Sequence, residues 1–244
     1  MTCERMIIGQ FSPYQESLHT ARYRYAQEFV VGKAVLDIAC GTGYGCAILR
    51  SAGAASVRGI DISGEAIEFA SHNYADPGIV FEVGNAEALS QLQNESFDIV
   101  TSFETIEHLP NVDPYLAEIW RVLRPGGMYL VSTPDRRLES TMYPLRGKPN
   151  NPFHIREYTR DVFILVLREK FQVVECVGQS YIPRSLVFWP TQVALKAACY
   201  AFRSLGAYGI IDRIYHNPNS TAVEPPQAHQ GSVATYWLAR TVRA

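Results

Sequence analysis

The residues between positions 35 and 45 combine an acidic side chain with a glycine-rich turn, a pattern suited to holding a charged ligand. Gly41, Gly43 and Gly45 follow the short apolar run 35–38, and residues without a Cβ let the backbone take positive φ and lie close against a ligand. A helix that begins after such a turn points unpaired N–H groups into the same space. Asp37 precedes the turn, and its charge disfavours a pyrophosphate and favours an ammonium or sulfonium group.

The spacing of these glycines separates the turn from the dinucleotide-binding fingerprint. That fingerprint has gaps of two and then three residues, whereas both gaps here are two and Cys46 stands where the third glycine would be. The chain also lacks a Tyr-x-x-x-Lys pair in the helices expected after the fourth and fifth strands. An NAD-dependent oxidoreductase is therefore disfavoured.

Two histidines and a glutamate could take part in proton transfer. Glu104 and His108 follow the apolar stretch 97–103, and His154 lies near the end of a long connection that begins at residue 133. Imidazole takes up a proton near neutral pH, so each histidine is a candidate general base for a poorly nucleophilic hydroxyl. The alternative is that each histidine orders its own loop by hydrogen bonds.

Asp61 occupies a position where a carboxylate commonly meets a sugar. It ends the segment 56–61, about twenty residues after the glycines. In a doubly wound sheet, a carboxylate at this point accepts hydrogen bonds from the two vicinal hydroxyls of a ribose. The competing role is that of a helix N-cap, for which Ser63 also qualifies.

These residues need a framework, and the chain supplies one by alternating two kinds of segment. Short apolar segments alternate with segments whose apolar residues recur every three or four positions, which predicts parallel strands joined by helices. We expect strands at 35–38, 56–61, 79–83, 97–103, 128–132 and 171–177. We expect helices at 14–31, 44–52, 65–74, 112–123 and 159–167. The carboxyl ends of the strands would then form the rim of a ligand crevice.

The stretch 35–45 resembles motif I of the class I S-adenosylmethionine (SAM) dependent methyltransferases, and the resemblance spans residues 14–180. The segment 103–108 is similar to motif IV of the small-molecule members, and RVLRPGGMYLVSTP is similar to a later turn and strand. This resemblance implies an α/β fold with a doubly wound, mostly parallel seven-stranded sheet and helices on both faces. The seventh strand would be antiparallel beside the sixth, and we assign it to 234–240.

The resemblance also implies a domain organisation. Residues 1–244 would form a single methyltransferase domain with an N-terminal helical cap at 1–33. A helical and loop insertion at 180–232 would separate strands six and seven. Its apolar part, 186–215, would form a substrate lid, a homodimer contact or a peripheral membrane contact. Its polar remainder is expected to be a mobile loop.

The methyl donor implied by the resemblance is SAM, which would leave as S-adenosylhomocysteine. The N-terminal helix would cover the methionine end, where Arg22 or Tyr14 would receive the carboxylate, unless both lie on a solvated helix face. Asn85 stands where the family usually has an aspartate against the adenine amino group, and the N–H of Ala86 would serve the adenine ring. The expected cofactor-binding residues are Tyr14, Arg22, Asp37, Ala39, Gly41, Gly43, Asp61, Ile62, Asn85, Ala86, Phe103 and Glu104.

The string Asn-Pro-Phe-His-x-Arg-Glu-Tyr at 151–158 is similar to one in bacterial methyltransferases that act on sugars, glycans or secondary metabolites. It implies O-methylation of such an acceptor, which could be lipid-linked, with His108, His154 and Glu104 as the candidate catalytic residues. The alternatives are N-methylation of a small molecule and SAM binding without methyl transfer. The Asn/Asp/Ser-Pro-Pro-aromatic motif is missing and the net charge is −2, which argue against a nucleic-acid substrate.

The composition favours a cytoplasmic protein without a metal. The sequence has no apolar run of about 18 residues, the length of a transmembrane helix. The apolar run near the N-terminus is too short for a signal peptide. The five cysteines are scattered, odd in number and without metal-ligand spacing, so we expect reduced thiols and no metal site.

Overall fold

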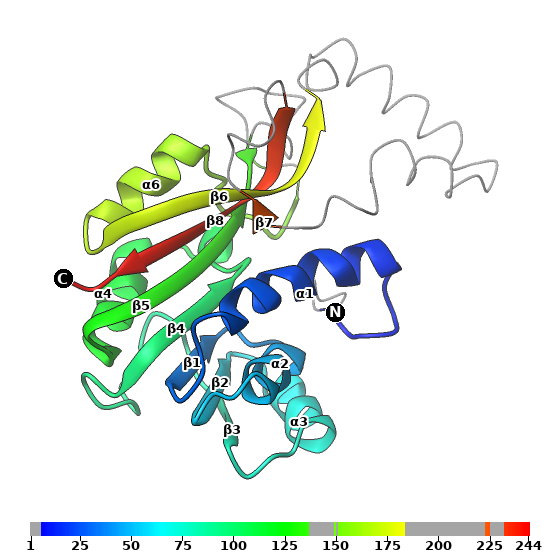
Figure 1. Cartoon of the computed structure of the whole chain (residues 1–244), viewed down its shortest axis with the longest axis vertical. Helices are drawn as coiled ribbons and strands as arrows, with labels where there is room; N and C mark the ends of the chain where they lie inside the picture. Colours follow the sequence, from blue (N-terminus) through cyan, green and yellow to red (C-terminus); the bar gives the residue numbers. More distant parts are fainter. Residues whose placement is uncertain (1–5, 137–148, 150, 184–222, 225–231) are drawn as a thin grey trace.

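Figure 1 shows the chain as a computed structural model, which describes residues 6–136, 149, 151–183, 223–224 and 232–244. The described strands form one sheet, with α1, α2 and α3 on one face and α4 and α6 on the other. The helices are α1 (Pro13–Gln27), α2 (Tyr44–Ser51), α3 (Gly64–Asn73), the 3-10 turn η1 (Ile106–His108), α4 (Val112–Val122) and α6 (Arg160–Arg168). The strands are β1 (Ala34–Ile38), β2 (Ser56–Asp61), β3 (Ile79–Val83), β4 (Phe97–Phe103), β5 (Leu123–Pro134), β6 (Gln172–Pro183), β7 (Val223–Glu224) and β8 (Ser232–Val242).

The strand order is β3-β2-β1-β4-β5-β8-β6-β7. Strands β1 to β5 pair in parallel, whereas β8 lies between β5 and β6 and is antiparallel to both. The predicted doubly wound sheet with an antiparallel last strand is therefore confirmed. The two-residue strand β7 pairs with β6 at the edge of the sheet, an addition that the sequence did not indicate.

The strand order reverses at β1, which pairs with β2 on one side and with β4 on the other. In open α/β sheets, ligands bind outside the carboxyl ends of the strands at such a point. Asp37 of β1 is in register with Gly59 of β2 and with Thr101 of β4. The glycine turn and the ends of β2 and β4 therefore surround one crevice.

The two faces of the sheet carry separate apolar clusters, which explains the near-continuous apolar character of the central strands. Successive residues of a strand point to opposite faces. Leu36 packs with the cluster that includes residues of α4 and α6, whereas Val35 packs with residues of α1 and α2. Helices on both faces of the sheet are thus confirmed.

Three boundaries differ from the predicted ones by four residues or more, and one of them is the start of β5, which lies at Leu123 and not at residue 128. A capping box between Ser12 and Gln15 starts α1, but the helix ends at Gln27, four residues early, because the chain turns through Gly32 (φ 70°) into β1. Strand β6 continues to Pro183, so the first residues of the predicted insertion belong to the sheet. Apart from residues 180–183, 223–224 and 232, the predicted insertion, with the expected contact surface 186–215, lies outside the described residues. None of the described helices has the length and apolar character needed to cross a bilayer.

Candidate functional site

The turn after β1 leaves open space on one side and packs tightly on the other. Ala39, Gly41 and Gly43 have φ angles of 56°, 55° and 85°. A Cβ on Gly43 would lie 2.6 Å from the Cβ of Ala70 on α3, whereas a Cβ on Gly41 would meet nothing within 4 Å. Left-handed backbone at a non-glycine residue such as Ala39 is of the kind that clusters at ligand sites. Gly41 therefore borders free space at the end of β1.

Asp37 lies beneath this turn and is fully buried. Its carboxylate accepts hydrogen bonds from the Thr101 hydroxyl at 2.7 Å, the Tyr23 hydroxyl at 3.1 Å and the Cys46 thiol at 3.4 Å. Burial raises the pKa of Asp37 to about 6, against these hydrogen bonds, which lower it. The side chain thus supports the turn from below.

Asp61 joins the end of β2 to the same turn. Its two carboxylate oxygens accept hydrogen bonds from the N–H groups of Gly41 and Ser63, both at 2.9 Å. Ser63 itself caps α3, so the N-cap interpretation of Asp61 is wrong. The next side chain, Ile62, is 73% exposed, which gives the rim an apolar surface.

Asn85 and Ala86 lie in the turn that follows β3, the neighbour of β2 in the sheet. The side-chain oxygen of Asn85 accepts a hydrogen bond from the N–H of Glu87 at 2.9 Å. Asn85 is exposed, whereas Ala86 is half-buried. The two residues therefore extend the carboxyl edge of the sheet beyond Asp61.

Arg22 is a fully buried arginine on the inner face of α1. Its Nε donates to the side-chain oxygen of Gln179 at 2.9 Å, and its guanidinium lies 4.4 Å from the centre of the Tyr236 ring. Its Nη1 lies 3.6 Å from a carboxylate oxygen of Glu104 but has no hydrogen-bond partner among the described residues. Tyr14, on the same helix, shares a 2.6 Å hydrogen bond with the Ser180 hydroxyl. The helix therefore brings an incompletely paired guanidinium to the crevice.

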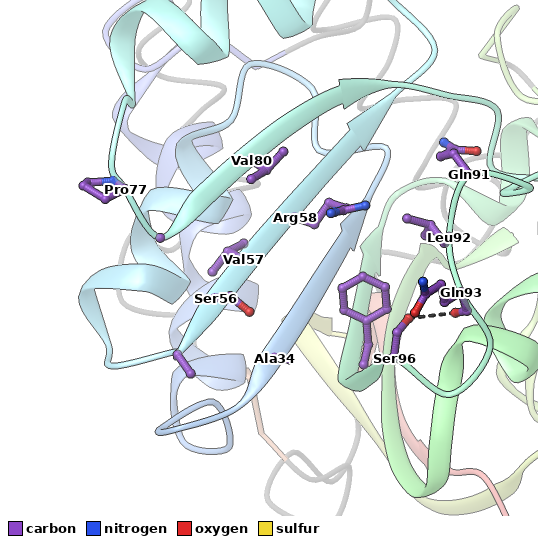
Figure 2. Close-up of a pocket in the computed structure, with 13 residues that line it drawn as sticks. Ala34, Ser56, Val57, Arg58, Pro77, Val80, Gln91, Leu92, Gln93 and Ser96 are labelled. Atoms are coloured by element: carbon purple, nitrogen blue, oxygen red, sulfur yellow. Dashed lines mark hydrogen bonds between the residues drawn. The ribbon is translucent and has the colours of Figure 1, made fainter.

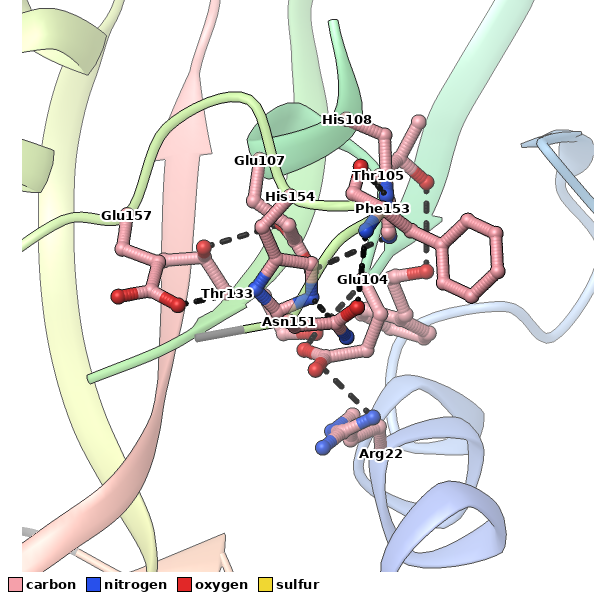
Figure 3. Close-up of polar contacts among 12 residues, drawn as sticks. Arg22, Glu104, Thr105, Glu107, His108, Thr133, Asn151, Phe153, His154 and Glu157 are labelled. Carbon is pink, nitrogen blue, oxygen red and sulfur yellow. Dashed lines mark hydrogen bonds and ion pairs between the residues drawn. The ribbon is translucent and has the colours of Figure 1, made fainter. Parts of the chain in front are cut away.

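The end of β4 is a second place of unusual backbone. Glu104 takes a φ of 55°, and its N–H donates to the Ser132 hydroxyl, which donates back to the Glu104 carboxylate at 2.7 Å. The preceding Phe103 is buried with its ring edge against the ring of Tyr23, with centroids 5.0 Å apart. Glu104 is thereby held toward Arg22, as Figure 3 shows.

Glu107 was not among the residues that the sequence suggested. It is fully buried; one oxygen accepts from the Thr133 hydroxyl at 3.0 Å, and the other, Oε1, has no hydrogen-bond partner among the described residues. Burial, with the Glu104 carboxylate nearby, raises the pKa of Glu107 well above its ordinary value. Its backbone carbonyl accepts the N–H groups of Ile155 and Arg156, which fixes the segment 151–158 against η1.

The two predicted histidines meet beside Glu107, although they are far apart in the sequence. Their ring centroids are 4.9 Å apart (Figure 3). His108 donates from Nδ1 to the Phe153 carbonyl at 3.0 Å, and His154 donates from Nδ1 to the Glu157 carboxylate at 3.2 Å. Asn151 donates its side-chain amide to Nε2 of His154 at 3.0 Å. His154 thus orders its own segment through Asn151 and Glu157, whereas His108 bonds to Phe153 of that same segment.

A groove of about 620 Å³ lies elsewhere, among the amino ends of β1 and β2 and the segment 91–97 (Figure 2). Ser56 of β2 lines it, whereas Asp61 of the crevice ends the same strand, about 16 Å further along at strand rise. Its one described charged lining residue, Arg58, pairs with Glu82 at 3.5 Å. The side chains that could do chemistry therefore lie outside this groove, at the carboxyl ends of the strands.

Comparison with known proteins agrees with this arrangement. The family described as a methyltransferase domain matches residues 36–131. A probable S-adenosylmethionine-dependent methyltransferase of Mycolicibacterium smegmatis is 37% identical over 180 residues, which are 73% of this chain and 67% of that protein. A ubiquinone biosynthesis O-methyltransferase of Burkholderia vietnamiensis is 34% identical over 120 residues, 48% of this chain and 51% of that protein. The chain thus spans two thirds of the first relative and about half of the second.

The fold is shared with solved structures. A SAM-dependent methyltransferase from Mesorhizobium loti has a TM-score of 0.62 to this chain, at 18% identity, with 93% of this chain and 100% of that chain covered. That likeness shows the fold, and the similarity to the M. smegmatis protein shows the family. From the glycine turn, the strand order and these relatives, we conclude that the chain belongs to the class I SAM-dependent methyltransferases, with SAM as its methyl donor.

Proposed function

We propose that this methyltransferase methylates a hydroxyl group of a sugar, glycan or secondary metabolite. The observation that carries the proposal is the pair His108 and His154, both held by Nδ1–H hydrogen bonds beside the end of β4. A hydroxyl is a poor nucleophile until its proton is removed, and an imidazole that carries its own proton on Nδ1 can accept that proton at Nε2. At His154 the acceptor hydroxyl would take the place of the Asn151 amide. An oxygen acceptor is further supported by the relative named a ubiquinone biosynthesis O-methyltransferase.

The residues around the crevice fit the methyl donor. SAM carries its methyl group on a sulfonium, which is a good leaving group. The incompletely paired Nη1 of Arg22 suits the methionine carboxylate, and Tyr14 lies eight residues earlier on the same helix. Glu104, 3.6 Å from Arg22, supplies the opposite charge for the amino group of the same zwitterion.

The other end of the donor has partners at the edge formed by β2 and β3. Asp61 accepts two N–H groups, but a carboxylate has about four lone-pair positions and can also accept both ribose hydroxyls. The exposed Ile62 offers an apolar surface to the adenine ring, and Asn85 and Ala86 lie near enough in the fold to face its edge. Asp37, Ala39, Gly41, Gly43 and Phe103 shape the floor of the crevice.

The acceptor would enter on the side of the segment 151–158. Phe153 and Ile155 are 48% and 53% exposed on either side of His154. These apolar side chains suit an acceptor with an apolar part, such as one carried on a lipid. His154 is the stronger candidate base, because the Glu157 carboxylate orients its ring and stabilises its charged form. His108 then positions the acceptor oxygen, and alignment with the methyl group supplies the rest of the rate enhancement.

The test is methyl transfer from isotope-labelled SAM to a panel of matched alcohols and amines, with the methylated atom located by mass spectrometry and NMR. We expect a methylated oxygen, and we expect His154→Ala to lower kcat about 10²–10⁴-fold while the Kd for SAM stays unchanged. His108→Ala should lower kcat as well. Full turnover in both variants, or methylation of the amines alone, would reject the proposal.

A further inference from the structure

Three side chains bring one potential metal ligand each to the same point between η1 and the segment 151–158. The ligand atoms of Glu107, His108 and His154 all lie within 4.8 Å of one another. Bonds of about 2.0–2.2 Å from a central ion to nitrogen and oxygen ligands would bridge such a spacing after small side-chain rotations. Glu107 and His108 are neighbours in the chain, and His154 lies more than forty residues later. Hydrogen bonds from the N–H groups of Ile155 and Arg156 to the Glu107 carbonyl hold the two segments together.

The hydrogen bonds of both imidazoles place the ring proton on Nδ1, so that a metal would bind at Nε2. Each histidine uses Nδ1–H as a donor, to the Phe153 carbonyl in one case and to the Glu157 carboxylate in the other. Each Nε2 is therefore a lone-pair atom. Nε2 of His108 lies 3.9 Å from Oε1 of Glu107, and Nε2 of His154 accepts the Asn151 amide. A bound ion would take the place of that amide.

The buried carboxylate supplies an independent reason to look for a cation. Oε1 of Glu107 is inaccessible to solvent and has no hydrogen-bond partner among the described residues. An unpaired buried carboxylate oxygen is costly, and buried charges in proteins are normally paired or bound to metals. The Arg22 guanidinium forms its ion pair with Glu104.

We propose that Glu107, His108 and His154 bind a divalent transition-metal ion, with Glu157 and the Phe153 carbonyl as the outer partners that orient the two imidazoles. Two imidazoles and one carboxylate favour ions such as Co²⁺, Zn²⁺, Fe²⁺ or Mn²⁺ over Mg²⁺ and Ca²⁺, which prefer oxygen ligands. Three protein ligands leave coordination positions open. This role rests on the proposed oxygen methylation: a bound ion would polarise the acceptor hydroxyl and lower its pKa, so that its proton passes to solvent. The two imidazoles would then act as ligands, and neither would be the general base.

The experiment uses the full chain, stripped with a chelator and titrated with Co²⁺ by calorimetry and visible absorption. We expect one equivalent to bind, with ligand-field bands, and binding of Mg²⁺ at least 100-fold weaker. Glu107→Gln, His108→Ala and His154→Ala should each weaken Co²⁺ binding at least tenfold, and Glu157→Gln about 10–100-fold. His72→Ala, on the exposed face of α3, is the matched control and should bind as the wild type does.

No bound Co²⁺, or unchanged affinity in all three ligand variants, would overturn the metal site. Circular dichroism and urea unfolding of each variant show whether it folds. Pulsed EPR of Mn²⁺ in the wild-type protein needs no variant: imidazole nitrogen coupling is expected, and its absence would contradict the site. Oxygen methylation that persists at full rate in excess chelator would reject the metal's role in the reaction while leaving the proposed function standing. Metal binding without oxygen methylation would leave the metal site standing and reject the proposed function.

Discussion

The position of Asp37 in the sequence suggested a contact with the ligand, but in the structure its side chain is fully buried. Three donors surround its carboxylate, from Tyr23, Cys46 and Thr101. The sequence showed the acidic residue before the turn, but which way a strand residue points depends on the packing of both faces of the sheet. Because Asp37 is buried, its protonation should change the free energy of unfolding, which can be measured without any ligand.

Stability should fall as Asp37 loses its proton in the folded state. Its pKa of about 6 in the folded protein lies above the ordinary 3.8, so between these values the folded state binds the proton more tightly than the unfolded state. The contribution is fully present below pH 4 and is lost as the pH rises through 6, a change of about 3 kcal/mol at 1.36 kcal/mol per pKa unit.

Urea unfolding from pH 4 to 7 measures this change. The free energy of unfolding of the wild type should fall relative to that of Asp37→Asn, which has no proton to lose at this position. Parallel pH profiles for the two proteins would show that Asp37 titrates normally.

Glu107 is the reverse case: the sequence did not suggest it as a site residue, and the structure places it beside both histidines. The sequence places it one residue from His108 and three from Glu104, and that proximity was the only signal available. Its importance arises from the approach of His154, which lies 47 positions from it along the chain. Contacts of that separation depend on how a long connection folds back, and local patterns do not encode it.

At the scale of elements, the crevice depends on the turn between β1 and α2 and on the helix α1, whose Tyr23 bonds to Asp37 beneath that turn. Tyr14 and Arg22 lie on one side of α1 and attach it to Ser180 and Gln179 of β6. Amphipathic spacing predicted the helix itself, but not its partners, because those belong to a strand about 150 residues later. The bounds of β1 to β4 lie within one residue of the predicted ones, because short apolar runs between turn residues mark these strands clearly.

The turn can be tested with two glycines of matched conformation. Gly41 and Gly126 both have positive φ, and a Cβ on either would meet nothing within 4 Å. Each change to alanine should therefore cost about 1–2 kcal/mol of stability from backbone strain. Gly41→Ala should also weaken SAM binding at least tenfold, because the methyl group would enter the crevice, whereas Gly126→Ala should not.

Calorimetry with SAM gives the two affinities, and urea unfolding gives the two stabilities. Equal SAM affinities for Gly41→Ala and Gly126→Ala would mean that the space beside Gly41 does not hold the donor.

At the scale of the whole molecule, the expectations from sequence succeeded where they depended on patterns along the chain. Strand order, direction and the two helical layers followed from alternating segments and from the likeness of 35–45 and 121–134 to family motifs. The extra strand β7 was missed because two residues carry no periodic signal. The joining of η1 to the segment 151–158 was missed because it uses backbone N–H groups, which every residue type except proline has.

Binding of the donor should stabilise the whole domain by mass action. At a SAM concentration of 100 times Kd the gain is about 2.7 kcal/mol, which for a chain of this length raises Tm by about 5–10 °C. NADH at the same concentration should leave Tm unchanged. Arg22→Lys should reduce the shift with SAM, because an ammonium lacks the fork that matches a carboxylate.

Arg24→Lys, at an exposed position of the same helix, is the control and should keep the full shift. A shift that is the same in the Arg22 and Arg24 variants would remove Arg22 from the site.

Strand β8 joins the parallel part of the sheet to β6. Because β8 lies between β5 and β6 and pairs with both, detaching it would divide the hydrogen-bonded sheet into two pieces and expose an unpaired edge on each. Such edges invite pairing between molecules. The glycine turn and the donor-facing strands would then lie on one piece, and the residues of β6 that anchor α1, Gln179 and Ser180, would lie on the other. The crevice therefore depends on β8 as well as on the residues that border it.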